Sequence, residues 1–131
     1  LGDTKGKVRI ISSLLSLSTD VCDHETRIFN QEATALDEHI VILAISMDLP
    51  FTLKNWCTAV KVDRVITLSD HKKSNFGKKY GVLIKEYRFL RRAVFVIDQR
   101  DQVVYSAYMP ILGEEPKYPE VLDAARNAFK R

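Results

Sequence analysis

Residues 8–17 read VRIISSLLSL, residues 18–37 read STDVCDHETRIFNQEATALD, and residues 40–46 read IVILAIS. The first stretch is apolar and partly alternating, which predicts a buried strand. Hydroxyl side chains then offer a helix N-cap, and Cys22 and Phe29 fall on one face of a helix that we expect to run to about residue 37. The β-branched run at 40–46 is typical of a strand buried on both faces. The order strand, helix, strand predicts two parallel neighbouring strands.

The rest of the chain continues this alternation and ends in a hairpin and a helix. The expected elements are a short helix at 52–60 after Pro50, a strand at 65–68, a helical turn at 75–80 closed by Gly81, paired strands at 93–97 and 103–108, and a last helix at 120–130 after Pro116 and Pro119. This order predicts the α/β class, as a thioredoxin-like three-layer sandwich with a mixed central β-sheet flanked by helices. We expect a single domain over residues 1–131.

Composition and charge exclude several classes of protein. With 46% hydrophobic and 28% charged residues among 131, the chain is typical of a soluble globular domain. Acidic and basic residues interleave and leave a net charge of only +3, so we expect no nucleic-acid partner. No apolar run reaches the roughly 18 residues of a membrane span, so we expect no membrane partner. The segment 5–17 is too short and too rich in serine for a signal peptide.

Cys22 is the first candidate for chemistry because it lies in the opening turn of the predicted helix. Backbone N–H groups at a helix N-terminus stabilise an anion, which favours a thiolate there. Thr19 lies three residues earlier, where one turn brings its hydroxyl beside the sulfur, to donate a hydrogen bond or to pass one on from a substrate. Two plainer interpretations stay open: Cys22 belongs to the apolar stripe of the helix, and Thr19 is only its N-cap.

The second cysteine, Cys57, follows Cys22 by 35 residues and falls on the next predicted helix. Two cysteines in a chain of this length are not a disulfide framework, so they are either inert or one functional pair. Beside Trp56, Cys57 is interpreted either as a core residue or as a resolving thiol that condenses with a sulfenic acid. No Cys-x-x-Cys motif occurs, so dithiol exchange of the thioredoxin kind is not encoded locally.

Arg92 is the third candidate because it stands at the start of the predicted strand 93–97. A guanidinium at a strand end reaches a site at a neighbouring strand–helix junction, where it holds an anionic sulfur and polarises a peroxide oxygen. Arg88 and Arg91 compete for this role, and the plainer interpretation of each of the three is a surface charge.

Other chemistries lack their residues. A cysteine phosphatase loop needs five residues between its Cys and its Arg, whereas Arg27 follows Cys22 after four. No glycine-rich phosphate loop is present, and the histidines and cysteines have no recognisable zinc-site spacing. The histidines are scattered in polar surroundings: His24, His39 and His71. Four acids are interpreted as a solvated helix face: Asp23, Glu25, Asp37 and Glu38.

Taken in order, several short stretches resemble the bacterial thiol peroxidases, an atypical two-cysteine class of peroxiredoxin. They extend from about residue 5 to the end of the chain: SLSTDVC at 16–22, TRIFN at 26–30, SMDLPF at 46–51, WC at 56–57, LSD at 68–70 and RAVFVID at 92–98. The resemblance implies a thioredoxin fold, usually homodimeric, that reduces hydrogen peroxide and organic hydroperoxides in the cytoplasm. It also implies thioredoxin as the reductant and no metal or organic cofactor.

The resemblance assigns a role to each candidate residue. Cys22 matches the peroxidatic cysteine, Thr19 its hydroxyl partner and Arg92 the arginine of the site. Cys57 matches the resolving cysteine, which forms an intramolecular disulfide with Cys22.

The sequence departs from the family pattern near the expected site. Leu15 occupies the position of a proline that shapes the pocket, Ser18 that of an aspartate, and Asn55 that of an arginine. Asp20 replaces a glycine, and its carboxylate is expected to repel a thiolate at Cys22. The hairpin that begins the family is expected to be missing. Two alternatives stay open: a thioredoxin-fold redox sensor, and a degenerate peroxiredoxin with weak peroxidase activity or inert cysteines.

Overall fold

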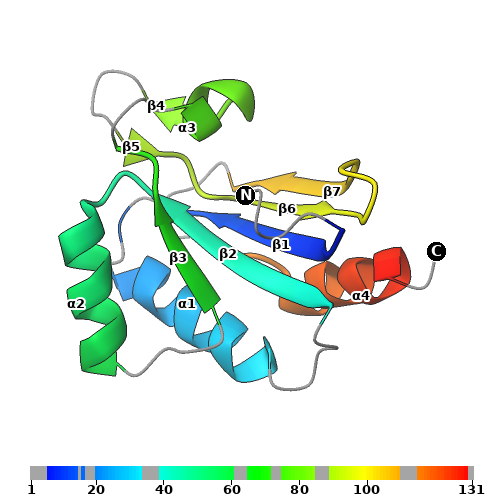
Figure 1. Ribbon diagram of the computed structural model, residues 1–131, viewed down its shortest axis with the longest axis horizontal. Helices are drawn as coiled ribbons and strands as arrows, with labels where there is room; N and C mark the ends of the chain where they lie inside the picture. The colour runs from blue at the N-terminus through cyan, green and yellow to red at the C-terminus, as the bar shows by residue number, and fades with distance from the viewer. Residues whose placement is uncertain are drawn as a thin grey trace.

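The computed structural model describes residues 6–14, 16, 20–33, 39–60, 65–71, 75–84, 89–109 and 115–129. Its centre is a five-stranded sheet in the order β3-β2-β1-β6-β7 (Figure 1). The strands are β1 (Val8–Ser13), β2 (Ile40–Ser46), β3 (Val65–Ser69), β6 (Ala93–Ile97) and β7 (Val103–Tyr108). β1, β2 and β3 are parallel, β6 is antiparallel to β1, and β7 is antiparallel to β6. The predicted mixed sheet is thereby confirmed.

Three helices cover one face of the sheet (Figure 1). They are α1 (Asp20–Ala33), α2 (Pro50–Val60) and α4 (Tyr118–Phe129). α1 contributes Cys22 and Phe29 to the core on this face, and α4 contributes Val121 and Ala125. All four are at most 1% exposed. Spacings of seven and four residues place each pair on one side of its helix, so the predicted placement of Cys22 and Phe29 on one apolar face of α1 is confirmed.

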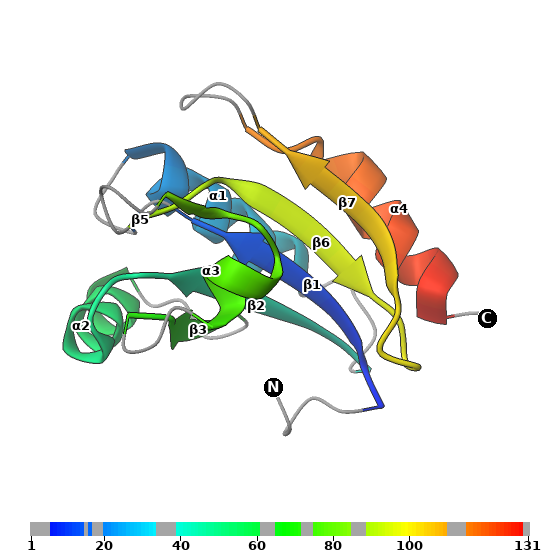
Figure 2. The ribbon, with the colours of Figure 1, turned by 90° about the horizontal axis from the view of Figure 1, so that it is seen from above.

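A thinner layer lies on the opposite face (Figure 2). It consists of α3 (Asn75–Lys79) and a two-stranded ribbon of β4 (Leu83–Ile84) and β5 (Phe89–Leu90). Phe76 and Leu90 of this layer pack with Ile11 and Phe95 of the sheet. Gly77 permits the close approach, because a Cβ at this position would lie 2.7 Å from the Leu90 side chain. Helices, sheet and this layer together form the predicted three-layer sandwich.

The two outer layers bury the central strands on both faces. All six residues of β1 and all five of β6 are buried, as are six of the seven residues of β2. The continuous apolar run at 40–46 is therefore explained by burial on both sides, as predicted. In the part of the chain that the structure describes, no helix is long and apolar enough to cross a membrane.

Element boundaries differ from the predicted ones at several points. β1 ends at Ser13 instead of residue 17, because its pairing with β6 ends where Ser13 meets Ala93. α2 begins at Pro50 and α4 at Tyr118, both earlier than predicted. Proline is tolerated in a first helical turn, where its missing N–H has no partner within the helix. The ribbon β4–β5 is absent from the predicted elements because strands of two residues carry too little pattern. Residues 34–38, the expected end of α1, lie outside the described ranges.

Candidate active site

Cys22 and Arg92 come together because two strand ends meet. α1 follows β1 and carries Cys22 in its first turn, while Arg92 directly precedes β6, whose first residue pairs with Ser13 at the end of β1. The Ser13 hydroxyl donates a hydrogen bond to the Arg91 carbonyl at 2.8 Å. The Arg92 carbonyl accepts a hydrogen bond from the Met109 N–H at 3.1 Å. The backbone that carries the Arg92 side chain is thus fixed from both neighbouring strands.

The guanidinium of Arg92 donates a hydrogen bond to the sulfur of Cys22, with Nη2 3.2 Å from Sγ. Both residues are buried, with 0% of Cys22 and 3% of Arg92 exposed. Arginine stays charged at every ordinary pH, and its field is less screened in the interior than at the surface. The Cys22 sulfur therefore faces a fixed positive charge as well as the N-terminus of α1.

Glu25 lies one helical turn after Cys22 and is 0% exposed, so its interpretation as part of a solvated face is wrong. The Ser12 hydroxyl donates a hydrogen bond to Glu25 Oε2 at 2.7 Å, and Oε1 has no hydrogen-bond partner among the described residues. Burial raises the pKa of Glu25 from 4.5 to about 7, although the Ser12 hydrogen bond and the Arg92 charge both oppose this shift. The site thus contains a carboxyl group that changes charge near neutral pH.

Tyr118, the first residue of α4, lies on the side of the site formed by that helix. Its ring meets Phe29 of α1 edge to face, with centroids 5.3 Å apart at 74°. Its hydroxyl donates a hydrogen bond to Glu115 Oε1 at 2.9 Å. Burial raises the pKa of Tyr118 well above its ordinary value, and the Glu115 hydrogen bond and the nearby Glu25 act in the same direction. The phenol therefore stays a neutral hydrogen-bond donor.

Asp23, the residue after Cys22, links α1 to α2. Its Oδ2 accepts a hydrogen bond from the indole Nε1–H of Trp56 at 3.1 Å. Its Oδ1 forms an ion pair with Arg27 one turn later on the same helix. Trp56 immediately precedes Cys57 in α2. The side chain of Cys57 lies outside the described part of the structure. Asp23, also assigned to the solvated face, is in fact partly buried by these contacts.

Asp48, in the SMDLPF stretch, joins the ends of the parallel strands. Its Oδ1 accepts a hydrogen bond from Ser16 Oγ at 2.7 Å, and its Oδ2 accepts one from Ser46 Oγ at 2.9 Å. Its backbone carbonyl accepts a hydrogen bond from Ser69 Oγ at the end of β3. The SMDLPF stretch therefore connects the C-terminal ends of β2 and β3 with Ser16, which precedes α1.

The structure brings together two of the four predicted site residues, Cys22 and Arg92. Thr19 lies outside the described residues, and for Cys57 only the backbone in α2 is described. Of the competing arginines, Arg91 is exposed and stacks over the Tyr108 ring, with Cζ 5.7 Å from its centroid.

Arg88 lies outside the described ranges. His24 is near Glu115, with Nε2 3.3 Å from its carboxylate. Among the described residues, no group of three or more His, Cys, Asp or Glu side chains could hold a metal ion.

Glu25 is the residue of the site that sequence reasoning missed. Its spacing of three from Cys22 places it on the same face of α1, and that signal was available in the sequence. Asp23, which is partly buried, and His24, which is exposed, directly precede it. Polar neighbours of this kind give no sign that the Glu25 side chain is buried.

The fold and the site define a class of protein. A thioredoxin-like sandwich carries a buried cysteine at a helix N-terminus, and a buried arginine points a hydrogen bond at its sulfur. A cysteine in such surroundings is typical of proteins that use a reactive thiol.

Comparison with known proteins identifies the family. Residues 1–106 match the sequence model of the AhpC/TSA family. A thiol peroxidase of Oceanobacillus iheyensis is 54% identical over 122 residues, which cover 93% of this chain and 74% of that protein. A thiol peroxidase of Bacillus subtilis is 46% identical over 130 residues, which cover 99% of this chain and 77% of that protein. The chain belongs to the AhpC/TSA family and, within it, to the thiol peroxidases, as its resemblance predicted.

Two solved structures share the fold of this chain. The crystal structure of a peroxiredoxin-like protein from Aquifex aeolicus superposes with a TM-score of 0.89 at 36% identity, over 95% of this chain and 74% of that one. A thiol peroxidase from Chromobacterium violaceum shares the fold, with a TM-score of 0.82 at 22% identity over 98% of this chain and 76% of that one. The predicted thioredoxin-like fold is confirmed.

Proposed function

We propose that this thiol peroxidase reduces hydrogen peroxide and organic hydroperoxides with Cys22 as the attacking nucleophile and Arg92 as its electrostatic partner. Peroxidase activity follows from membership of the family, whose relatives are thiol peroxidases at 46–54% identity. The assignment of roles is supported by one observation above all, the 3.2 Å hydrogen bond from the buried Arg92 guanidinium to Cys22 Sγ.

In the first step, the Cys22 thiolate attacks one oxygen of the hydroperoxide. A sulfur–oxygen bond forms, the oxygen–oxygen bond breaks, and the leaving alkoxide or hydroxide takes up a proton. The sulfur is oxidised to a sulfenic acid and the peroxide is reduced to an alcohol or water. Negative charge moves from sulfur to the leaving oxygen during this step. Arg92, already held beside the sulfur, stabilises that charge without reorganising, as does the N-terminus of α1.

In the second step, the thiol of Cys57 condenses with the sulfenic acid of Cys22. A sulfur–sulfur bond forms, the sulfur–oxygen bond breaks, and the hydroxide leaves as water with the thiol proton. Thioredoxin then reduces the intramolecular disulfide by thiol exchange and is itself oxidised. Thr19, three residues before Cys22, supplies a hydroxyl that orients the peroxide. We further propose that the protein acts in the cytoplasm as a homodimer.

Two single-cysteine variants test these roles. Cys22→Ser is expected to abolish peroxide turnover, because serine provides no thiolate at neutral pH. Cys57→Ser is expected to consume one equivalent of peroxide and then stop, since the sulfenic acid has no resolving thiol. Peroxide consumption is measured with thioredoxin, its reductase and a nicotinamide donor, and the oxidation state of Cys22 by mass spectrometry.

Each variant also has a contradicting result. Full turnover by Cys22→Ser would remove Cys22 from the reaction, and an unchanged steady state in Cys57→Ser would remove Cys57. Oxidation of wild-type Cys22 many times slower than that of a working peroxidase would favour a redox sensor, a role consistent with the complete burial of the sulfur.

A further inference from the structure

Glu25 is a buried carboxyl group that the two steps of the proposed function do not use. It is 0% exposed and follows Cys22 by three residues, so the two side chains are neighbours on one face of α1. Its Oε2 accepts the Ser12 hydrogen bond at 2.7 Å, and its Oε1 has no hydrogen-bond partner among the described residues. A buried carboxylate with an unpaired oxygen is costly, which favours the neutral acid in the resting site.

The groups that act on Glu25 come from each element packed against it. Ser12 belongs to β1, Arg92 directly precedes β6, and Glu115 lies shortly before α4. Tyr118, the first residue of α4, also interacts with Glu25. Arg92 is the cation among these groups, and its charge opposes the effect of burial, which raises the pKa of Glu25 to about 7.

Arg92 faces two acidic groups with a single positive charge. Its Nη2 donates a hydrogen bond to Cys22 Sγ at 3.2 Å, and its charge also acts on the Glu25 carboxyl group. A buried thiolate and a buried carboxylate beside one guanidinium would leave one negative charge uncompensated. When Cys22 is a thiolate, Glu25 is therefore favoured in its protonated form.

We propose that Glu25 is the general acid of the first step and gives its proton to the oxygen that leaves the peroxide. This inference rests on the proposed function, because it takes Cys22 as the nucleophile. The sulfur bonds to one peroxide oxygen, the oxygen–oxygen bond breaks with its electron pair on the leaving oxygen, and the carboxyl proton transfers to that oxygen. The products are a sulfenic acid, an alcohol or water, and the Glu25 carboxylate. A proton from water restores Glu25 before the next turnover.

The charge of the site stays balanced through this step. Before it, Arg92 faces a thiolate and a neutral carboxyl group; after it, Arg92 faces a neutral sulfenic acid and a carboxylate. The negative charge moves from Cys22 to Glu25 and keeps the same counterion. As the sulfur loses its charge, Arg92 acts on Glu25 alone, so the carboxyl group becomes a stronger acid during the reaction. A donor inside the site also suits a sulfur that is 0% exposed.

Two oxidants with different leaving groups separate proton donation from packing. tert-Butyl hydroperoxide expels an alkoxide, which needs a proton, whereas peracetic acid expels acetate, which is stable without one. Glu25→Gln keeps an acceptor for Ser12 and has no acidic proton. With tert-butyl hydroperoxide its rate of Cys22 oxidation is expected to fall by about a hundredfold, at the lower end of general acid catalysis. With peracetic acid the rate is expected to match the wild type. Stopped-flow single turnovers, with mass spectrometry of Cys22, measure both rates.

The pH dependence of the wild type is a second measurement, which needs no variant. The amount of Cys22 thiolate affects both oxidants equally and cancels in the ratio of the tert-butyl hydroperoxide rate to the peracetic acid rate. This ratio is expected to be highest at low pH and to fall as the pH rises through about 7, because Glu25 then loses its proton. The measurement is confined to pH values at which peracetic acid is itself protonated. In Glu25→Gln the ratio is expected to be low at every pH.

Glu115→Gln is the matched control. It makes the same substitution at the other carboxylate that acts on Glu25, and its amide oxygen still accepts the Tyr118 hydrogen bond. The Glu115 side chain is 43% exposed, so water screens its charge. At a pH well below the pKa of Glu25, the ratio of the two rates is expected to stay within about twofold of the wild type.

The outcomes distinguish the general acid from the proposed function. If neither oxidant modifies Cys22 in the wild type, the proposed function fails in its first step. If both do, but Glu25→Gln slows both alike or slows neither, the general acid is overturned and the proposed function stands. A wild-type ratio that does not change with pH overturns it as well. A ratio in Glu115→Gln as low as in Glu25→Gln would assign the effect to charge alone and would also overturn it.

Discussion

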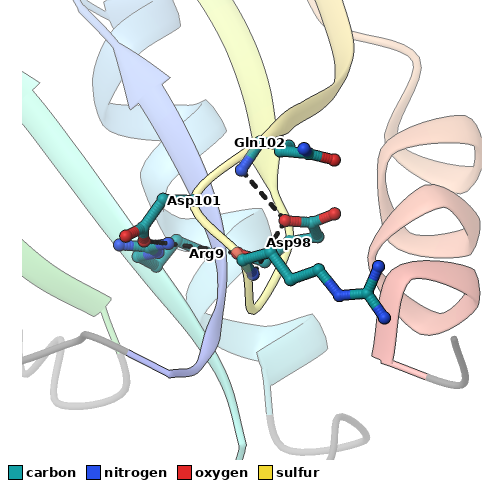
Figure 3. A network of polar contacts seen from close by, with 5 residues as sticks. Arg9, Asp98, Asp101 and Gln102 are labelled. Carbon is teal, nitrogen blue, oxygen red and sulfur yellow. Dashed lines mark hydrogen bonds and ion pairs between the residues drawn. The ribbon is translucent and has the colours of Figure 1, made fainter.

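Two buried arginines lie at opposite ends of the β1–β6 pair and have different interaction partners. Arg9 is 5% exposed and Arg92 is 3% exposed. Arg9 is opposite Ile97 near the start of β1, whereas Arg92 precedes the residue of β6 that meets the end of β1. Arg9 donates a hydrogen bond from Nη2 to the Asp98 carbonyl at 3.1 Å and forms an ion pair with Asp101 (Figure 3). Arg92 donates instead to a cysteine sulfur.

The surroundings of Arg9 make it part of the hairpin between β6 and β7. Asp98 Oδ1 accepts hydrogen bonds from the N–H groups of Arg100 and Gln102, both at 2.9 Å. Asp101 has a φ of 63°, in the left-handed region that aspartate tolerates better than most residues. Arg9 therefore closes a turn that is already well defined, and its charge meets a fixed carboxylate.

The acids near the two arginines account for the difference in role. Asp101 has a side chain 55% exposed and pairs directly with Arg9, so this pair resembles a partly solvated salt bridge. Glu25, near Arg92, is 0% exposed, and burial raises its pKa to about 7. A guanidinium whose charge is compensated by a fixed ion pair stabilises the fold. A guanidinium aimed at a thiol, beside an acid that resists ionisation, is available for chemistry.

Exchanging each arginine for methionine separates these roles, and Arg92→Met has the larger effect. The rate of Cys22 oxidation is expected to fall by about a hundredfold to a thousandfold, as when a pre-positioned donor to a developing anion is removed. Stopped-flow kinetics with hydrogen peroxide measure this rate. Methionine fills the buried site without charge, so the free energy of unfolding changes little. A rate within a few-fold of the wild type would contradict the role of Arg92.

Glu25→Gln has the next largest effect, on the pH dependence of stability. The pKa of Glu25 is raised from 4.5 to about 7 by burial, so the folded state binds this proton more tightly than the unfolded state. Its contribution is most favourable below pH 4.5 and is lost as the pH rises to about 7. Glutamine keeps an acceptor for Ser12 and cannot ionise. The variant is therefore expected to gain stability relative to the wild type between these pH values, by about 3 kcal/mol.

Urea unfolding at several pH values tests this expectation. The control Glu120→Gln removes an exposed carboxylate of α4 and is expected to keep the wild-type pH profile. Parallel profiles for Glu25→Gln and the wild type would show that the pKa of Glu25 is the same in the folded and unfolded states, which would contradict the raised pKa.

Arg9→Met has the smallest effect, and it falls on stability instead of activity. Loss of the Asp98 hydrogen bond and the Asp101 ion pair is expected to lower the free energy of unfolding by about 2 kcal/mol. The loss is no larger because water hydrates the Asp101 carboxylate once its partner is gone. The rate of Cys22 oxidation is expected to stay at the wild-type value. Asp101→Asn removes the carboxylate charge and tolerates the same φ, so it is expected to cost less than Arg9→Met. Loss of peroxidase activity at constant stability in Arg9→Met would erase the contrast between the two arginines.

Local sequence pattern was sufficient to predict the strands of the central sheet, the helices and the position of Cys22. The strand at 93–97 was predicted at its observed bounds, and Cys22 lies in the first turn of α1 as its N-cap signals indicate. The choice between Arg91 and Arg92 was not available from pattern. It depends on which strand pairs with β6 and in what register, and the pairing of Ser13 with the first residue of β6 sets it.

Burial of polar residues was the main feature that the hydrophobic pattern of the sequence did not predict. The prediction groups Glu25 with three other acids on a solvated helix face, yet the Ser12 hydroxyl of β1 donates a hydrogen bond to it in the core. That contact joins residues of two elements, and hydrophobic periodicity carries no information on such a pair. The Trp56–Asp23 hydrogen bond escaped prediction for the same reason, because it depends on how α2 packs beside α1.

The most direct test of the central claim is the mass of the reduced protein after one equivalent of hydroperoxide. Digestion without a reducing agent is expected to yield, within seconds, a peptide pair joined through Cys22 and Cys57 and lighter by two hydrogens than the separate peptides. That result would establish the attacking and resolving roles together. Unmodified sulfurs at both positions after the same treatment would contradict the claim that Cys22, held against Arg92, is the nucleophile of a peroxidase.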